Sequence, residues 1–189
     1  MNIETTPLPD VLLITPRRFG DARGFFSESW NRKALEAEGL HLPDFVQDNH
    51  SFSTAKGTLR GLHYQSPPHA QGKLVRCGRG ALFDVAVDIR KGSPTYGQWY
   101  GTELSFENGK QLLVPAGFAH GFVTRAPETE IIYKCSDYYA QETEGAVAWD
   151  DPEVGVDWGL GGMTPVLSDK DANAPSLADL NSPFTFEGV

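Results

Sequence analysis

The sequence predicts an all-β fold, a sandwich or barrel of short strands with one clear helix. Short apolar or alternating runs recur between turn residues, roughly ten in all, a pattern typical of sandwiches and barrels. The 189 residues include 20 glycines and 13 prolines, which favours strands and turns over long helices. This length suits one domain, expected to span residues 1–189 with an N-terminal strand segment. Trp149 and Trp158 predict that the C-terminal tail packs back on the body.

Strands are expected wherever apolar residues cluster or alternate between turn signals. In chain order they cover residues 11–14, 19–28, 45–53, 59–65, 73–76, 81–89, 99–105, 111–114, 114–123 and 129–135. The dipeptide Asn108-Gly109 predicts a hairpin between the strands on either side of it. The helix is expected over residues 31–38, with Asn31 as its N-cap and Gly39 at its end.

Two of these strands carry polar side chains that bear on function. In residues 45–53 the odd-numbered side chains from Gln47 to Ser53 are polar, so this strand is either a solvent-facing edge or the polar lining of a barrel mouth. In residues 59–65, alternation places one set of side chains on each face. The first set is Leu59, His63 and Gln65, and the second is Arg60, Leu62 and Tyr64. Further polar residues must converge on His63 before it indicates a site.

Composition and charge argue against several classes of function. The formal net charge of -9 disfavours a general nucleic-acid or anionic-membrane surface, although a local cluster of cations can still bind a small anion. No apolar run approaches the ~20 residues that span a bilayer, and residues 1–16 lack the pattern of a signal peptide. Cys77 and Cys135 have no metal-binding spacing, and nothing demands a disulfide between them. We therefore expect a cytoplasmic protein without nucleic-acid or membrane partners.

The sequence resembles the cupin jelly rolls in two places. Residues 109–120 match the second cupin signature up to His120, and Thr124 stands where the signature has Asn. An earlier stretch matches the first signature with His63 in place, but Gln65 stands where the signature has a second histidine and Lys73 where it has an acidic ligand. A metal site needs three or four N or O ligands, and an ammonium among them repels a divalent cation. We therefore expect a cupin-like jelly roll, a double-stranded β-helix with a few short helices, that holds no metal.

Longer motifs extend the resemblance over nearly the whole chain. They are Phe19-x-Asp21-x-Arg23-Gly24-x-Phe26, Gln47-Asp48-Asn49-His50-Ser51, Leu59-Arg60-Gly61-Leu62-His63, Lys73-Leu74-Val75-Arg76, Val85-Ala86-Val87-Asp88-Ile89-Arg90, Pro115-x-Gly117-Phe118-Ala119-His120-Gly121-Phe122 and Lys170-Asp171. In their shared order and spacing the chain resembles the dTDP-4-dehydrorhamnose 3,5-epimerases. The resemblance implies a homodimer that uses no metal or nucleotide cofactor. It would convert dTDP-4-dehydro-6-deoxy-D-glucose to dTDP-4-dehydro-L-rhamnose, inverting C3 and C5 on the route to dTDP-L-rhamnose.

The resemblance also assigns roles to individual residues. Epimerisation beside a ketone needs a base, a group that stabilises the enolate, and an acid on the other face of the sugar. The base is implied to be His63, oriented by Asp171, and the enolate is implied to be held by Lys73. The acid is implied to be Tyr133, since a phenol with an ordinary pKa of ~10 is a neutral donor at pH 7. The residues implied in substrate binding are Arg23, Glu28, Gln47, Asp48, Asn49, Arg60, His120, Tyr139, Glu144 and Lys170.

Two of these assignments concern the ends of the substrate and the partner subunit. Tyr139 matches the aromatic residue that stacks on thymine, and Arg23, Arg60 and Lys170 match cations that bind near the diphosphate. Family dimers exchange N-terminal strands, so Arg23 and Glu28 are expected to serve the partner's site.

Three other functions fit part of the pattern. One is an epimerase that inverts only C3 or only C5 of another dTDP-4-keto-6-deoxysugar, which product analysis separates from the 3,5-epimerase. Another is a non-catalytic sugar-nucleotide-binding cupin, and the third is a metal-dependent cupin isomerase or oxygenase. The complete set of His63, Lys73, Tyr133 and Asp171 weighs against the binding module.

Overall fold

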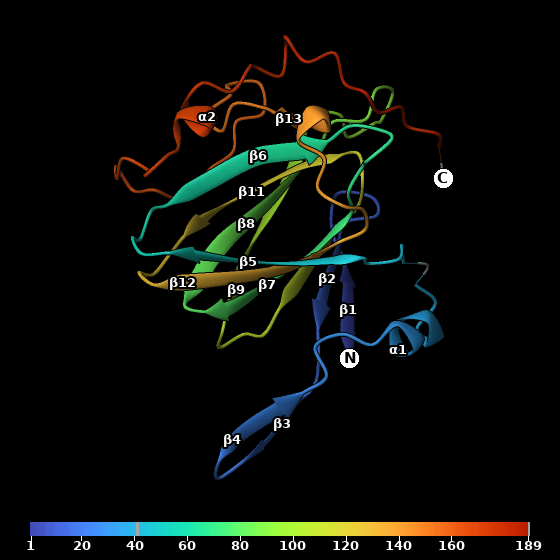
Figure 1. The fold of residues 1–189 in the computed structure, drawn as a ribbon, viewed down its shortest axis with the longest axis vertical. Helices are drawn as coiled ribbons and strands as arrows, with labels where there is room; N and C mark the ends of the chain where they lie inside the picture. The colour runs from blue at the N-terminus through green and yellow to red at the C-terminus, as the bar shows by residue number, and fades with distance from the viewer. Residues whose placement is uncertain (41, 189) are drawn as a thin grey trace.

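The computed structural model describes residues 1–40 and 42–188, which form two antiparallel β-sheets packed face to face (Figure 1). The six-stranded sheet contains, in spatial order, β1 (Asn2–Thr5), β2 (Leu12–Thr15), β10 (Gln111–Val114), β7 (Lys73–Arg79), β12 (Thr129–Cys135) and β5 (Gln47–Ser53). The five-stranded sheet contains β13 (Glu144–Ala146), β6 (Leu59–Gln65), β11 (Phe118–Thr124), β8 (Ala81–Asp88) and β9 (Trp99–Ser105). From β5 to β8, and again from β9 to β13, consecutive strands alternate between the sheets, which is the winding of a jelly roll. The predicted all-β jelly roll is confirmed.

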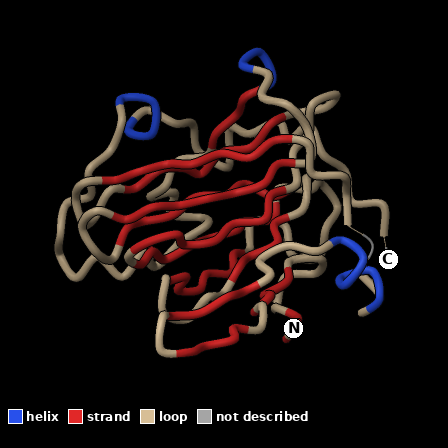
Figure 2. Tube along the Cα trace, turned by 60° about the horizontal axis from the view of Figure 1, so that its bottom comes forward, coloured by secondary structure: helices blue, strands red, loops and turns tan. Residues whose placement is uncertain are grey.

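A hairpin and a few short helices lie outside the two sheets. The hairpin consists of β3 (Arg18–Asp21) and β4 (Gly24–Ser27), and it projects away from the body (Figure 1). The helices in the described parts of the chain are α1 (Arg32–Ala37), the 3-10 helix η1 (Gln141–Thr143) and α2 (Asp169–Ala172). They lie at the margins of the stacked strands (Figure 2). Within the described residues, no helix has the length and apolar character needed to cross a membrane.

Helix α1 begins and ends within one residue of the predicted range 31–38. The Asn31 side chain accepts a hydrogen bond from the Ala34 N–H at 3.1 Å, so it caps a helix end that would otherwise leave this donor unpaired. Gly39 follows the end with a φ of 86°, a left-handed conformation that glycine adopts without a steric penalty. Both capping predictions are confirmed.

Apolar side chains form three layers across the molecule. Between the sheets, Val75 and Leu112 are completely buried in a cluster to which both sheets contribute. A second cluster lies on the outer face of the five-stranded sheet, where Trp158 packs with residues of β6 and β8. The Trp158 indole N–H donates to the Trp149 carbonyl at 2.7 Å, and the tail therefore packs on the body as predicted. The third cluster joins Leu35 of α1 to the outer face of the six-stranded sheet.

The predicted hairpin at Asn108-Gly109 is wrong. The dipeptide does form a tight turn, in which the Asn108 side chain accepts from the Ser105 and Lys110 N–H groups at 3.0 and 2.9 Å. However, β9 pairs with β8, while β10 pairs with β2 and β7 in the other sheet. The two-residue loop that makes Asn-Gly a strong hairpin signal is absent here, because residues 106–110 separate the strands. The turn instead carries the chain from one sheet to the other.

A β-bulge in β6 overturns the predicted alternation of its side chains. His63 pairs with His120 and Arg60 pairs with Phe122, so three steps along β6 match two along β11. Gly61, with a φ of 126°, allows the extra residue, and its Cα faces Gly121 so closely that a Cβ would lie 2.5 Å from the Gly121 Cα. Arg60 and His63 therefore face the same cavity, whereas alternation had placed them on opposite faces. The bulge brings a guanidinium beside the histidine.

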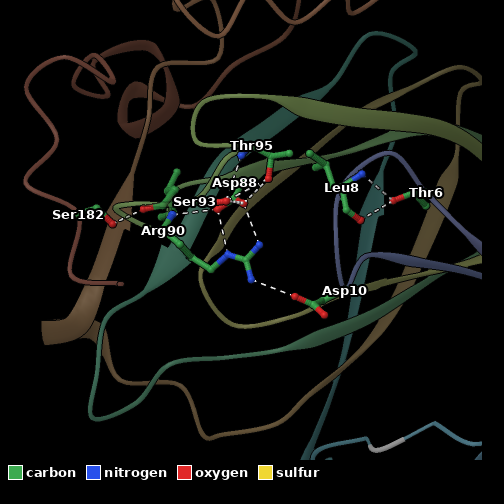
Figure 3. A network of polar contacts seen from close by, with 9 residues as sticks. Thr6, Leu8, Asp10, Asp88, Arg90, Ser93, Thr95 and Ser182 are labelled. Atoms are coloured by element: carbon green, nitrogen blue, oxygen red, sulfur yellow. Dashed lines mark hydrogen bonds and ion pairs between the residues drawn. The ribbon is translucent and has the colours of Figure 1, made fainter. Parts of the chain in front are cut away.

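The end of β8 ties both ends of the chain to the body (Figure 3). Arg90 donates to both carboxylate oxygens of Asp88, at 3.0 and 2.8 Å, and to Asp10 of the N-terminal loop at 3.0 Å. Ser182 of the C-terminal tail donates to the Ile89 carbonyl. Burial disfavours the Asp88 anion, but its hydrogen bonds from Arg90 and two hydroxyls outweigh burial and lower its pKa. These hydrogen bonds attach the N-terminal loop and the C-terminal tail to the residues that follow β8.

Candidate active site

One cavity collects all four predicted catalytic side chains from both sheets and from α2. Its lining residues are Ser51, Arg60, His63, Lys73, His120, Phe122, Tyr133, Ser168 and Asp171. His63 and His120 are direct neighbours across the β6–β11 pair of the five-stranded sheet. Lys73 and Tyr133 come from β7 and β12 of the six-stranded sheet. The site therefore lies between the sheets, with a different set of groups on each wall.

His63 and Asp171 form a short, well-supported pair. The His63 Nε2 lies 2.6 Å from the Asp171 Oδ1, and the carboxylate also accepts from the Gly61 N–H at 3.2 Å and the Ser168 hydroxyl at 2.7 Å. Burial disfavours the Asp171 anion, but these hydrogen bonds outweigh burial and lower the pKa of Asp171. An ionised carboxylate only accepts, so the neutral imidazole carries its proton on Nε2 and its lone pair on Nδ1. The pair is built to make Nδ1 a base.

Lys73 places an amine inside the cavity wall. Burial lowers the pKa of the Lys73 amine, while the nearby Cys135, Asp84 and Glu144 raise it and Lys170 lowers it further. In the described parts of the chain, no carboxylate lies within ion-pair distance of this amine. An amine in the cavity wall without a carboxylate partner is suited, when it is protonated, to balance an anion that develops during a reaction.

Tyr133 lies across the cavity from the histidines. Burial raises the pKa of its phenol, Cys135 raises it further, and Asn49 and Arg60 oppose the rise. The phenol is therefore neutral at pH 7 and can donate a proton or a hydrogen bond.

A second His–Asp pair lies beside the first, and sequence reasoning missed its carboxylate. The His120 Nε2 lies 2.8 Å from the Asp84 Oδ1, and Asp84 is completely buried. Its other oxygen, Oδ2, is buried without a hydrogen-bond partner among the described residues. The signal was present, because Asp84 interrupts the apolar run of residues 81–87, and a charged residue there needs a buried partner.

Strand β5 presents its polar face to the interior. It is the edge strand of its sheet, and yet Ser51 lines the cavity and Ser53 is buried, so the polar-lining interpretation is correct. On the same face, the Gln47 amide donates to Asn49 at 3.1 Å. Ser51 was not predicted as a site residue. Its hydroxyl is buried without a partner in the part of the chain that the structure describes.

Three further predicted residues, Glu144, Lys170 and Tyr139, lie near one another but are not among the residues that line the cavity. The Lys170 amine donates to the Glu144 carboxylate at 2.6 Å, which joins α2 to β13. Tyr139 lies in the loop before η1 with 57% of its surface exposed. The Gln47 side-chain oxygen accepts from the Tyr139 N–H at 3.0 Å, so this loop is tied to β5.

Three predicted substrate-binding side chains do not reach the cavity of their own chain. Arg23 lies on the projecting hairpin with 90% of its side chain exposed, and it pairs with Asp21. Glu28 follows that hairpin and accepts from Asn31 at 3.0 Å. Asp48 lies on the outer face of β5, where it accepts from the Lys134 amine at 2.9 Å.

The residues at the cupin ligand positions do not fit a metal ion. The Gln65 amide is engaged at both ends by backbone groups, since it donates to two carbonyls and accepts from one N–H. Lys73 supplies a cation where the signature has an anionic ligand.

Comparisons with known proteins agree on one family. A sequence model of the dTDP-4-dehydrorhamnose 3,5-epimerases matches residues 5–179. The dTDP-4-dehydrorhamnose 3,5-epimerase of Pseudomonas aeruginosa is 55% identical over 172 residues, 91% of this chain and 93% of the relative. That of Shigella flexneri is 52% identical over 179 residues, 95% of this chain and 97% of the relative.

Among solved structures, a dTDP-6-deoxy-D-glucose-3,5-epimerase from Legionella pneumophila, in complex with dTDP-4-keto-L-rhamnose, aligns with a TM-score of 0.93. It shares 46% identity, and the alignment covers 99% of each chain. With its fold, its cavity and these relatives in agreement, the chain belongs to the dTDP-4-dehydrorhamnose 3,5-epimerase family.

Proposed function

We propose that His63, Asp171, Lys73 and Tyr133 carry out the family's isomerase reaction, the 3,5-epimerisation that serves dTDP-L-rhamnose biosynthesis. One observation carries this proposal. A histidine with a carboxylate 2.6 Å behind it and a half-buried neutral phenol lie on opposite walls of one cavity, which the Lys73 amine also lines.

Each chemical step has a group suited to it. The Nδ1 of His63 removes the proton beside the C4 ketone, and Asp171 stabilises the imidazolium that forms. The negative charge then moves to the C4 oxygen, where the Lys73 ammonium balances it. Tyr133 returns a proton from the other wall, and solvent restores the protonation states of both groups. No step requires a metal or a redox cofactor, because only protons move.

The groups in and near the cavity suit a dTDP-sugar. Tyr139 offers an exposed aromatic surface on which thymine stacks. Arg60 and Lys170 supply positive charge for the diphosphate, with Glu144 paired to Lys170. His120 in the cavity wall can donate and accept hydrogen bonds, as can Gln47 and Asn49 on the polar face of β5.

We propose a homodimer in which the β3–β4 hairpin of each chain reaches the partner's cavity. The hairpin extends away from its own body (Figure 1). Its side chains Arg23 and Phe26 are 90% and 70% exposed. A projecting apolar and cationic hairpin is suited to pack on a second copy and deliver Arg23 and Glu28 there. Asp48 is not included in the proposed binding site of its own chain, because its side chain lies on the outer face of β5 and is paired with Lys134.

We further propose that residues 1–189 act as one domain, since the termini anchor on β8. The cytoplasm remains the predicted compartment. Cys77 and Cys135 are free buried thiols, which suits a reducing environment.

The proposed chemistry is tested by NMR of dTDP-4-dehydro-6-deoxyglucose in D2O. The wild-type chain should introduce deuterium at C3 and C5 and form dTDP-4-dehydro-L-rhamnose, the L-lyxo-configured 4-ketose. His63→Ala should abolish exchange at both carbons, while His50→Ala, a control on the outer face of β5, should leave it unchanged. Undiminished exchange in His63→Ala would overturn the role of His63, and binding without any exchange in the wild type would overturn the catalytic assignment.

The shared site is tested by mixing two inactive variants. Arg23→Ala and His63→Ala should each be impaired alone. After exchange of subunits, mixed dimers should hold one intact site, with Arg23 from one chain and His63 from the other. Because about half of the dimers are mixed, activity should recover to about a quarter of the wild-type value. Failure to recover while mixed dimers are demonstrably present would refute the shared site.

A further inference from the structure

Gln65 ends β6 with a buried side-chain amide whose hydrogen bonds all go to backbone groups. The residue is 4% exposed. Its Nε2 donates to the His69 carbonyl at 2.7 Å and to the Tyr138 carbonyl at 3.1 Å, and its Oε1 accepts from the Ala140 N–H at 2.9 Å. The amide thus joins two loops that follow β6 and β12. Side chains that replace it without these donors and acceptor leave three backbone groups unpaired.

A second glutamine completes the hold on the same segment. The Gln47 Oε1 accepts from the Tyr139 N–H at 3.0 Å. Three consecutive residues, 138 to 140, therefore each have a backbone group bonded to a glutamine amide. One glutamine comes from the five-stranded sheet and the other from the six-stranded sheet. The segment has no helix or strand bonds of its own, so these amides fix its position between the two sheets.

The side chains of this segment behave in the opposite way. Tyr138 and Tyr139 are 63% and 57% exposed, although the backbone between them is held on both sides. A rigid backbone that carries a free aromatic ring suits stacking, because the ring needs no ordering when a flat ligand arrives. Gln65 itself is not among the residues that line the catalytic cavity.

We propose that Gln65 is a positioning residue for nucleotide binding. It fixes the position and orientation of the Tyr139 ring relative to the thymine of the bound nucleotide. This inference rests on the proposed function, in which Tyr139 stacks on thymine. His63 lies two residues before Gln65 on the same strand and faces the cavity. Strand β6 therefore carries both the proposed catalytic base, His63, and the residue that holds the backbone of Tyr139, Gln65. Gln65 thereby acts on binding and not on proton transfer.

The test is a double-mutant cycle between Gln65→Met, which keeps the length of the side chain, and Tyr139→Ala. Loss of a base–aromatic stack weakens binding by about tenfold. Each single variant should therefore raise KM for the dTDP-sugar and Kd for dTDP about tenfold, with kcat within about threefold of wild type. The double variant should bind no more weakly than Tyr139→Ala, because Gln65 acts through that ring.

Hydrogen exchange adds a readout that does not depend on turnover. The Ala140 amide should exchange faster in Gln65→Met, while amides of β8 keep their wild-type protection. If Gln65→Met does not fold, Gln65→Glu keeps the size and removes the donor, and it should show the same separation of KM from kcat.

Three results would overturn the inference: additive losses in the double variant, a fall in kcat with an unchanged KM, or wild-type Kd for dTDP in a folded Gln65 variant. Failure of the proposed function itself has a different signature. In that case the wild-type chain neither binds dTDP nor turns over the dTDP-sugar.

Discussion

Replacing Asp171 with asparagine isolates the charge behind the proposed base. The Asp171 Oδ1 accepts from both His63 and the Gly61 N–H, so the amide oxygen of Asp171→Asn must take that position to keep both hydrogen bonds. The amide NH2 then faces Ser168, whose hydroxyl can turn to accept. The imidazole keeps its tautomer and its orientation, and only the negative charge is lost.

The size of the effect follows from the geometry of the pair. The His63 Nε2 and the Asp171 Oδ1 are 2.6 Å apart, which puts the centres of the two charged groups about 4 Å apart. At an effective dielectric constant of about 20, two unit charges at 4 Å attract by about 4 kcal/mol. The imidazolium forms only after proton abstraction, so this attraction stabilises the transition state more than the ground state. We therefore expect kcat to fall by about 10²–10³.

The assay is steady-state turnover of dTDP-4-dehydro-6-deoxyglucose, with dTDP binding measured in parallel. Kd for dTDP should stay near the wild-type value, because Asp171 is buried behind the histidine. The matched control is Asp169→Asn, the same substitution at an exposed position of α2, which should leave kcat unchanged. A folded Asp171→Asn protein with kcat within threefold of wild type would refute the reasoning.

Four other predictions concern the Lys73 amine, the nearby Asp84 carboxylate, the β-bulge at Gly61 and the Cys77 thiol. Lys73→Met should lower kcat by about 10²–10³ and leave dTDP affinity intact in calorimetry, because the enolate loses its counter-charge. Asp84→Asn should move the basic limb of the kcat–pH profile to lower pH, since the Asp84 charge raises the pKa of the Lys73 amine; an unmoved limb would contradict this. Gly61→Ala should lower the free energy of unfolding, measured with urea, by about 3 kcal/mol, because its Cβ would lie 2.5 Å from the Gly121 Cα. Burial raises the pKa of Cys77 to about 11, so this thiol should resist a disulfide reagent at pH 8 until the protein is unfolded.

Much of the fold was accessible from the sequence because turn residues separate its strands. The N-cap at Asn31 and the packing of Trp158 follow from local chemistry and were predicted. The sheet that a strand joins after a turn cannot be predicted in the same way. Asn108-Gly109 indicates that the chain turns, but the sheet that the next strand joins depends on partners distant in sequence.

The site residues that belong to sequence motifs could be predicted one by one. The contacts that depend on how strands pair in space were missed. Strict alternation separated Arg60 from His63, and the bulge at Gly61 reversed that result. A glycine inside a strand indicates a bulge or a close backbone approach, and here it marks both. Asp84 was missed because its partner His120 lies on a neighbouring strand, where sequence distance gives no hint of contact.

The two-sheet architecture has a stereochemical consequence. The proposed base belongs to one sheet and the proposed acid to the other, so a sugar held between them loses a hydrogen toward one wall and gains one from the opposite wall. Configuration is then inverted by the spacing of two layers that share a core, and not by a moving loop. If Tyr133 were silenced, the hydrogen could return only from the wall that removed it. Isotope would then wash into the substrate with its configuration retained, which separates exchange from inversion.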